Sequence, residues 1–299
     1  MVELKENFEA NPQSFLGDEI AEIKACATRY DVMLPELRTK IKESLDALEA
    51  RLEFTENPKS DIEYKAKITR HDSSLTLTQF NNGTLLLQGK TDKFFDSSCD
   101  LIERIANPSD KEVIARFISS DDKNLGLFEA KYTPHLIEIA EDNVKEKMGG
   151  VYEYLEPHDQ KWFVASECLC LTKIPLPEFS PLVMPVSKAF EGFAKKLLIG
   201  IGLFESDHFK TKKGTFSVLN DTTNPKRKAI CEKERHVDTM LKKISSCIDI
   251  NRNFMMHSDD SQITKINNQE DAEMKVNRIF ADTKEIFEYF DSIFNLQST

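Results

Sequence analysis

The sequence predicts an α+β protein of more than one domain, on the basis of three observations. The chain has 299 residues, which is more than one ordinary core encloses. Apolar residues recur at spacings of three and four near both ends, as in amphipathic helices, and alternate with period two between residues 62 and 88, as in strands. We therefore expect an N-terminal helical segment (1–57), a small antiparallel α+β domain (58–154) and a C-terminal all-α helical bundle (155–299).

Composition narrows the class of protein. Hydrophobic residues make up 40% of the chain and charged residues 30%, which is typical of a folded globular protein. No window reaches the roughly 18 apolar residues that span a bilayer, and the first residues are acidic and lack the apolar stretch of a signal peptide. We expect a cytoplasmic protein that does not enter a membrane.

The cysteines give no sign of a metal or redox site. No two of the six have C-x-x-C spacing, so we expect free thiols, no metal and no cofactor. Residues 162–172 fit either a strand or a helix. On a strand, Cys168 and Cys170 would share one face.

The N-terminal part carries a helical stripe. Its members recur every three or four residues: Leu34, Leu37, Ile41, Leu45, Leu48 and Leu52. Residues 14–52 are therefore expected to be helical, followed by a polar linker at 53–60.

In the next segment, apolar residues alternate with polar residues at period two, as in β-strands. Strands are expected at 62–68, 75–80 and 84–88, and the turn Asn81-Asn82-Gly83 between the last two has the composition that a hairpin with positive φ requires. A helix is expected at 92–105, and residues 109–150 are expected to be mostly helical.

The C-terminal part predicts three long amphipathic helices at 183–203, 230–257 and 270–296, joined by polar loops. The first has an inner stripe formed by Val186, Phe190, Phe193, Leu197 and Ile201. Such helices pack as an up-down bundle.

The end of the second of these helices carries the candidate chemistry, in Asn251-Arg252-Asn253-Phe254-Met255-Met256-His257. With about 100° per residue and Ile244 at the buried centre, Arg252 lies about 80° away, Asn253 about 180° and His257 about 220°. Asn253 and His257 are i, i+4 neighbours, and the helix C-terminus favours a charged imidazole.

These residue types suit metal-free RNA cleavage. An imidazole can take the proton from a ribose 2′-hydroxyl or protonate the leaving oxygen, and a guanidinium can grip the phosphate as its charge grows. One chain supplies only one such set, so a second copy related by a two-fold axis would supply the rest.

Charge is compatible with a local RNA site. The net charge of −11 argues against binding nucleic acid over the whole surface, but residues 206–243 have a basic excess. Within it, Arg235, Lys242 and Lys243 are the candidate RNA-binding residues. The histidines at 71, 135, 158, 208 and 236 are expected at the surface without a catalytic role.

Several segments carry a family resemblance. Arg252-x4-His257 resembles the R-x4–6-H signature of HEPN-type ribonucleases. Val183–Phe193, with Glu191 and Gly192, resembles the helix of ribonuclease LS (RnlA-type) toxins that bears an additional catalytic glutamate. Residues 68–102 resemble the TBP-like domain of the same toxins.

The resemblance implies a TBP-like domain followed by a HEPN bundle that forms a homodimer. It further implies a metal-independent endoribonuclease with Arg252, His257 and Glu191 in its active site and Asn253 in support. The partners would be an RNA substrate and a cognate antitoxin of a toxin–antitoxin or phage-defence pair. The chain departs from the family because the first of two TBP-like domains is missing, and Asp259 replaces the tyrosine that is adenylylated in some HEPN toxins.

Two alternatives stay open. HEPN-like bundles can act as dimerisation or RNA-binding modules without cutting. A metal-dependent nuclease or phosphatase is the third interpretation, but the sequence has no H-x-x-x-H, D-x-D or E-x-K cluster in a strand context to support it.

Overall fold

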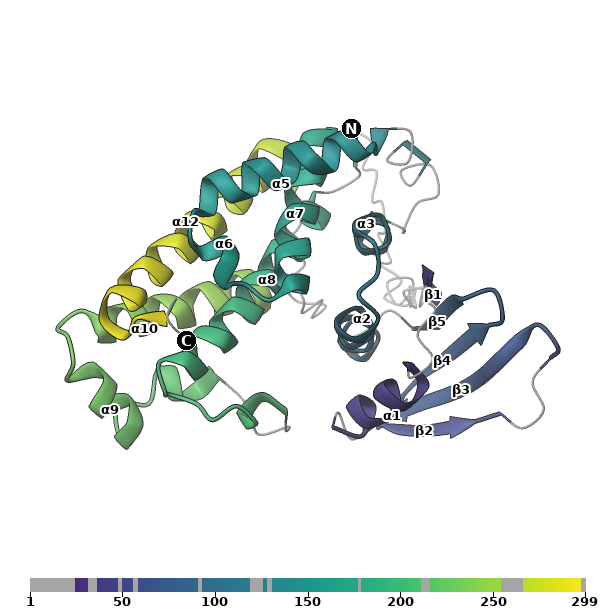
Figure 1. Cartoon of the computed structure of the whole chain (residues 1–299), viewed down its shortest axis with the longest axis horizontal. Helices are drawn as coiled ribbons and strands as arrows, with labels where there is room; N and C mark the ends of the chain where they lie inside the picture. Colours follow the sequence, from purple (N-terminus) through teal and green to yellow (C-terminus); the bar gives the residue numbers. More distant parts are fainter. Residues whose placement is uncertain are drawn as a thin grey trace, which may run out of the picture.

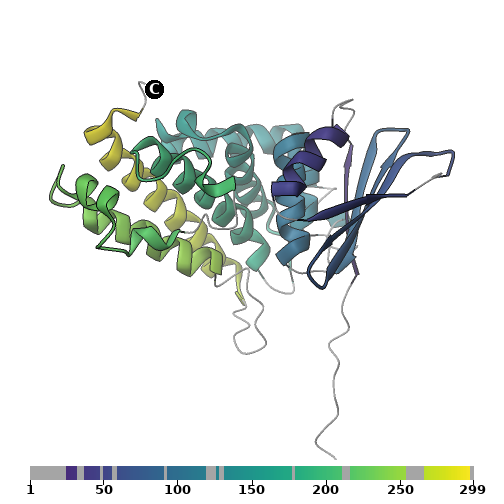
Figure 2. The ribbon, with the colours of Figure 1, turned by 90° about the horizontal axis from the view of Figure 1, so that it is seen from below.

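The computed structural model describes residues 25–31, 37–47, 50–55, 59–90, 93–118, 126–127, 131–176, 179–210, 216–253 and 266–296. An antiparallel sheet lies at one end of the molecule and a helical bundle at the other (Figure 1). Helices α1 (Leu37–Ala47) and α2 (Lys93–Ala106) lie between the two, as the view from below shows (Figure 2). The α+β class with a C-terminal helical bundle is therefore confirmed.

The sheet has the strand order β1-β5-β4-β3-β2, and every neighbouring pair is antiparallel. Its strands are β1 (Ala25–Asp31), β2 (Arg51–Phe54), β3 (Ile62–Arg70), β4 (Ser73–Phe80) and β5 (Thr84–Lys90). The predicted hairpin between β4 and β5 is confirmed. Gly83 has φ +93° and donates its N–H to the carbonyl of Phe80, a conformation that favours glycine because it has no Cβ.

One face of the sheet packs on α1 and α2. Along β3, Tyr64, Ala66 and Ile68 are buried while the residues between them are exposed, as expected for a strand with one face in a core. The opposing side chains come from the predicted stripe of α1, with Ile41 and Leu45, and from α2. This small core is separate from that of the bundle.

The expected helix over residues 14–52 is wrong in part. Helix α1 covers only Leu37–Ala47, and Ala25–Asp31 and Arg51–Phe54 are the two edge strands of the sheet. The strand β1 pairs with β5, with Tyr30 opposite Leu85, so its conformation depends on a partner more than fifty residues away. The predicted domain limits stay predictions, although strands on both sides of residue 57 belong to one sheet.

The bundle is built on α8 (Ser180–Gly200), which packs against α7 (Pro157–Thr172) and α12 (Gln269–Phe294). The other elements are α3 (Asp110–Ile118), α5 (Pro134–Met148), α6 (Val151–Tyr154), α9 (Pro225–Cys231), α10 (Val237–Cys247), η3 (Ile248–Asn253) and the short turns η1 (His208–Lys210) and η2 (Phe216–Leu219). All five members of the predicted α8 stripe, from Val186 to Ile201, are buried. The expected helices at 183–203 and 270–296 are thus confirmed to within a few residues.

Two other expectations in this part need correction. Residues 162–172 are helical within α7, so Cys168 and Cys170 lie on a helix; both are free. The single helix expected over 230–257 is divided into α9, α10 and η3, and His236 stands at the start of α10. Since η3 has π-helical geometry, the assumed 100° per residue does not hold over Ile248–Asn253.

Side-chain caps explain where several helices begin. The Thr133 hydroxyl accepts a hydrogen bond from the Leu136 amide at the start of α5, and the Asn224 side chain accepts one from the Arg227 amide at the start of α9. The Asn268 side chain accepts the Asp271 amide at 2.8 Å before α12. Each cap satisfies a backbone donor that has no partner within its own helix.

Candidate functional site

Helix α7 forms hydrogen bonds to the backbone of α8 at the point where a proline interrupts α8. Pro185 has no backbone N–H and disturbs the helical hydrogen bonding around it. The Ser166 hydroxyl accepts the Val186 amide at 2.9 Å and donates to the Leu182 carbonyl at 2.8 Å. One buried side chain of α7 therefore satisfies both backbone groups and fixes the turn that precedes Glu191.

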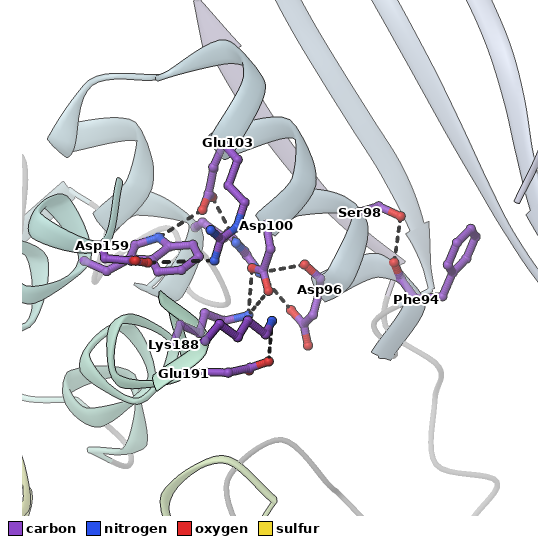
Figure 3. Close-up of polar contacts among 12 residues, drawn as sticks. Phe94, Asp96, Ser98, Asp100, Glu103, Asp159, Lys188 and Glu191 are labelled. Carbon is purple, nitrogen blue, oxygen red and sulfur yellow. Dashed lines mark hydrogen bonds and ion pairs between the residues drawn. The ribbon is translucent and has the colours of Figure 1, made fainter. Parts of the chain in front are cut away.

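The predicted catalytic carboxylate, Glu191, is half-buried at the edge of the apolar face of α8. Its Oε1 lies 2.7 Å from Nζ of Lys195, one turn further along. Lys188 is one turn earlier and points away from Glu191 toward Asp100 of α2 (Figure 3). Glu191 therefore lies at the border between core and solvent, and its catalytic role stays a prediction.

The Arg252–His257 motif is described only in part. The backbone of Arg252 and Asn253 forms the end of η3, and η3 packs against α8, which carries Glu191. His257 and the side chains of Arg252 and Asn253 lie outside the described residues. The first residues of the motif and Glu191 therefore come from two elements in contact, and the geometry of the three side chains stays a prediction.

The predicted RNA-binding cations differ in how they are paired. Lys243 Nζ lies 2.9 Å from Asp282 and 2.6 Å from Glu285, whose hydrogen bonds raise its pKa although burial acts in the opposite direction. Lys242 is more exposed and pairs with Asp238 at 2.7 Å, and Arg235 is exposed. Lys243 is thus already neutralised by two carboxylates, while Lys242 and Arg235 are both exposed.

A buried polar network joins the sheet unit to the bundle (Figure 3). At its centre Arg116 of α3 binds three acidic residues of α2, at 3.4 Å from Asp96, 2.8 Å from Asp100 and 3.0 Å from Glu103. Lys188 of α8 donates to both oxygens of Asp100 at 2.7 Å. Helices from both units therefore share one set of charges.

The carboxylates of this network are well supplied with donors. The Tyr30 hydroxyl of β1 donates to Glu103 at 2.9 Å, and the Trp162 indole of α7 donates to its other oxygen at 3.1 Å. Burial raises the pKa of Asp100, but Lys188 and Arg116 outweigh it and hold that pKa well below its usual value. Asp100 is therefore ionised at neutral pH, and the network holds α2 against α8 close to Glu191.

A second polar cluster, which no sequence pattern indicated, lies at the same junction. His158 Nε2 lies 3.0 Å from Oδ1 of Asp159, and the guanidinium of Arg104 contacts the same ring nitrogen. The His158 side chain is only 18% exposed, so the expectation of a simple surface histidine is wrong. No sequence signal pairs residues 54 positions apart, which is why the cluster could not be found beforehand.

Asp159 also explains the glycine that follows Glu191. A Cβ at Gly192 would lie 2.1 Å from Oδ1 of Asp159, and Asp159 is 1% exposed, so its carboxylate has no room to move. Gly192 thus allows the close approach of α7 to α8.

Gly192→Ala is expected to destabilise the fold by roughly 1–3 kcal/mol through overpacking, which exceeds the gain of up to about 1 kcal/mol from better helix propensity. Urea unfolding followed by circular dichroism measures the difference. The Asp159→Ala background removes the obstructing carboxylate and should reduce the loss. A Gly192→Ala protein as stable as the original chain would contradict this packing argument.

The described residues hold no group of three or more His, Cys, Asp or Glu side chains placed to bind a metal ion. No helix in the described part of the chain has both the length and the apolar character needed to cross a membrane.

Comparison with known proteins identifies the fold. No protein-family model matches the sequence, and no curated protein matches it either. Among solved structures, the chain is similar to the Escherichia coli toxin LsoA in complex with the T4 phage antitoxin Dmd, with 12% identity and a TM-score of 0.50. The match covers 88% of this chain and 99% of that chain. The chain therefore shares the fold of this solved structure.

Proposed function

We propose that this chain is the toxin of a toxin–antitoxin or phage-defence pair and acts as a metal-independent endoribonuclease of HEPN type. The observation that supports the proposal is that η3, which ends with the first residues of the Arg-x4-His motif, packs against α8, which carries the half-buried Glu191, in an LsoA-like fold. The resemblance in sequence to ribonuclease LS toxins supports the same assignment.

The proposed reaction uses the 2′-hydroxyl of the RNA as nucleophile. An imidazole at His257 takes the hydroxyl proton while the 2′-oxygen attacks the adjacent phosphorus, and the bond to the 5′-oxygen breaks as that oxygen gains a proton. Arg252 binds the phosphate oxygens as their negative charge grows. Glu191 orients these groups, with Asn253 in support. The products are a 2′,3′-cyclic phosphate and a 5′-hydroxyl.

The remaining base or acid comes from a second copy. A two-fold axis that places two Arg252–His257 pairs across one cleft would give each phosphodiester both a base and an acid. The proposed assembly is therefore a homodimer with a composite site.

The proposed partners are RNA and a cognate antitoxin that silences the enzyme. LsoA is seen in complex with an antitoxin, and a ribonuclease toxin requires such control in the cytoplasm where it meets RNA.

Incubation of the purified protein with RNA and excess EDTA tests the proposal. We expect cleavage to continue in the chelator and to leave 2′,3′-cyclic phosphate ends, identified by mass spectrometry. RNA binding without cutting would instead favour a non-catalytic HEPN-like module. Cleavage that EDTA abolishes and Mg²⁺ restores would identify a metal-dependent nuclease, and both results would overturn the proposed mechanism.

A further inference from the structure

In the cluster of Arg104, His158 and Asp159, one nitrogen atom of the histidine ring lies against both an acceptor and a donor. His158 Nε2 contacts the Asp159 carboxylate and the Arg104 guanidinium together. A ring nitrogen holds either a proton, which it donates, or a lone pair, which accepts. It therefore satisfies Asp159 or Arg104, but not both.

A proton on this nitrogen stabilises the protein more by serving Asp159 than a lone pair would by serving Arg104. Its carboxylate is 1% exposed, and neither oxygen has a hydrogen-bond partner among the described residues. A buried carboxylate without a donor is costly, and Arg104 Nη2 stays 3.8 Å away. The stable arrangement thus places a proton on Nε2, which lies 3.0 Å from Oδ1 of Asp159.

The guanidinium of Arg104 then has N–H groups without a close acceptor among the described residues. Within the described part of the chain, its recorded acceptors are His158 Nε2 and the more distant Asp159. Its side chain is 36% exposed, and the guanidinium is held over the Trp162 ring at 5.1 Å. A guanidinium fixed on an aromatic face and open to solvent is well prepared to bind a planar pair of anionic oxygens.

The surroundings favour an anion at this place. His158 and Asp159 lie in the first turn of α7, whose N-cap residue Glu156 makes no side-chain cap, and helix N-termini attract negative charge. The Asp159 carboxylate also abuts Gly192, next to Glu191 on α8. An anion bound by Arg104 would therefore lie beside the turn that carries the proposed catalytic carboxylate.

We propose that Arg104 binds a backbone phosphate of the RNA substrate, outside the scissile position, with His158 and Asp159 as positioning residues. A phosphate accepts the free guanidinium donors and leaves the Nε2 proton to Asp159, so that both Arg104 and Asp159 are satisfied. The inference rests on the proposed function and adds a substrate subsite at the junction of α2 and α7.

The salt dependence of RNA binding tests the subsite. In a cleavage-deficient His257→Ala protein, log Kobs for a short single-stranded RNA is measured against log salt concentration. Arg104→Gln should flatten the slope by about 0.7, the value expected for one lost phosphate contact. Arg51→Gln is the control, because Arg51 is an exposed arginine paired with Glu53 on the edge strand β2, and it should leave the slope unchanged.

The outcomes separate this inference from the proposed function. An unchanged slope in Arg104→Gln, or equal flattening in Arg104→Gln and Arg51→Gln at an unaltered melting temperature, overturns the subsite while chelator-resistant cleavage still stands. Competition by inorganic phosphate that depends on Arg104, without any change in RNA slope, would restrict the site to free phosphate and also overturn it. Failure of the wild-type chain to bind or cut RNA would remove both proposals.

Discussion

Replacing His257 with alanine is expected to lower the rate of RNA cleavage by roughly 10²–10⁴-fold, the usual contribution of one positioned acid or base. The imidazole is the only group of the proposed site suited to proton transfer near neutral pH. Single-turnover cleavage of a labelled RNA in EDTA measures the change. His135→Ala is the matched control, because His135 is exposed on α5 and contacts only Glu138 among the described residues.

A mixing experiment distinguishes a shared site from one that each chain completes alone. Arg252→Ala and His257→Ala proteins should each be nearly inactive, and their mixture should regain activity because heterodimers contain one intact Arg252 and one intact His257. Unfolding and refolding the two together ensures exchange of subunits. If the mixture stays as inactive as its components while heterodimers form, the composite site is disproved.

Local patterns predicted much of this fold. The turn at Asn81–Gly83 and the alternation on both sides of it fixed the hairpin, since neighbouring strands need only a short loop. The spacing of the predicted α8 stripe identified the buried face of that helix, and all five members of the stripe are buried in the structure. In both cases, the information lies within a few residues of the element that it describes.

The structural features that the sequence did not predict depend on contacts between residues far apart in the chain. The edge strand β1 forms because β5 offers it a register, and nothing within Ala25–Asp31 prescribes this over a helix. The backbone from Ile248 to Asn253 is π-helical, so the 100° per residue of an α-helix does not apply to this stretch. Arg104 and His158 meet only because α2 packs on α7, so spacing could not reveal them.

Arg116→Met is expected to destabilise the protein by roughly 3–5 kcal/mol, the usual loss when one member of a buried ion pair is removed. Arg116 is 3% exposed and is the cation for Asp96, Asp100 and Glu103 together. Methionine fills similar space but leaves Glu103 buried with only its neutral donors Tyr30 and Trp162. Urea unfolding followed by circular dichroism and by Trp162 fluorescence measures the loss.

The loss of unfolding free energy in Arg116→Met should arise from the burial of Arg116 and not simply from the removal of a positive charge. Arg278→Met removes an arginine that is 73% exposed and binds Asp282 at 3.0 Å, so it should change the unfolding free energy by less than about 1 kcal/mol. Adding Glu103→Gln to Arg116→Met should recover part of the stability, because the amide removes the uncompensated charge. Equal losses in the two arginine variants would mean that the network contributes little, and the sheet unit would then be joined to the bundle by apolar packing alone.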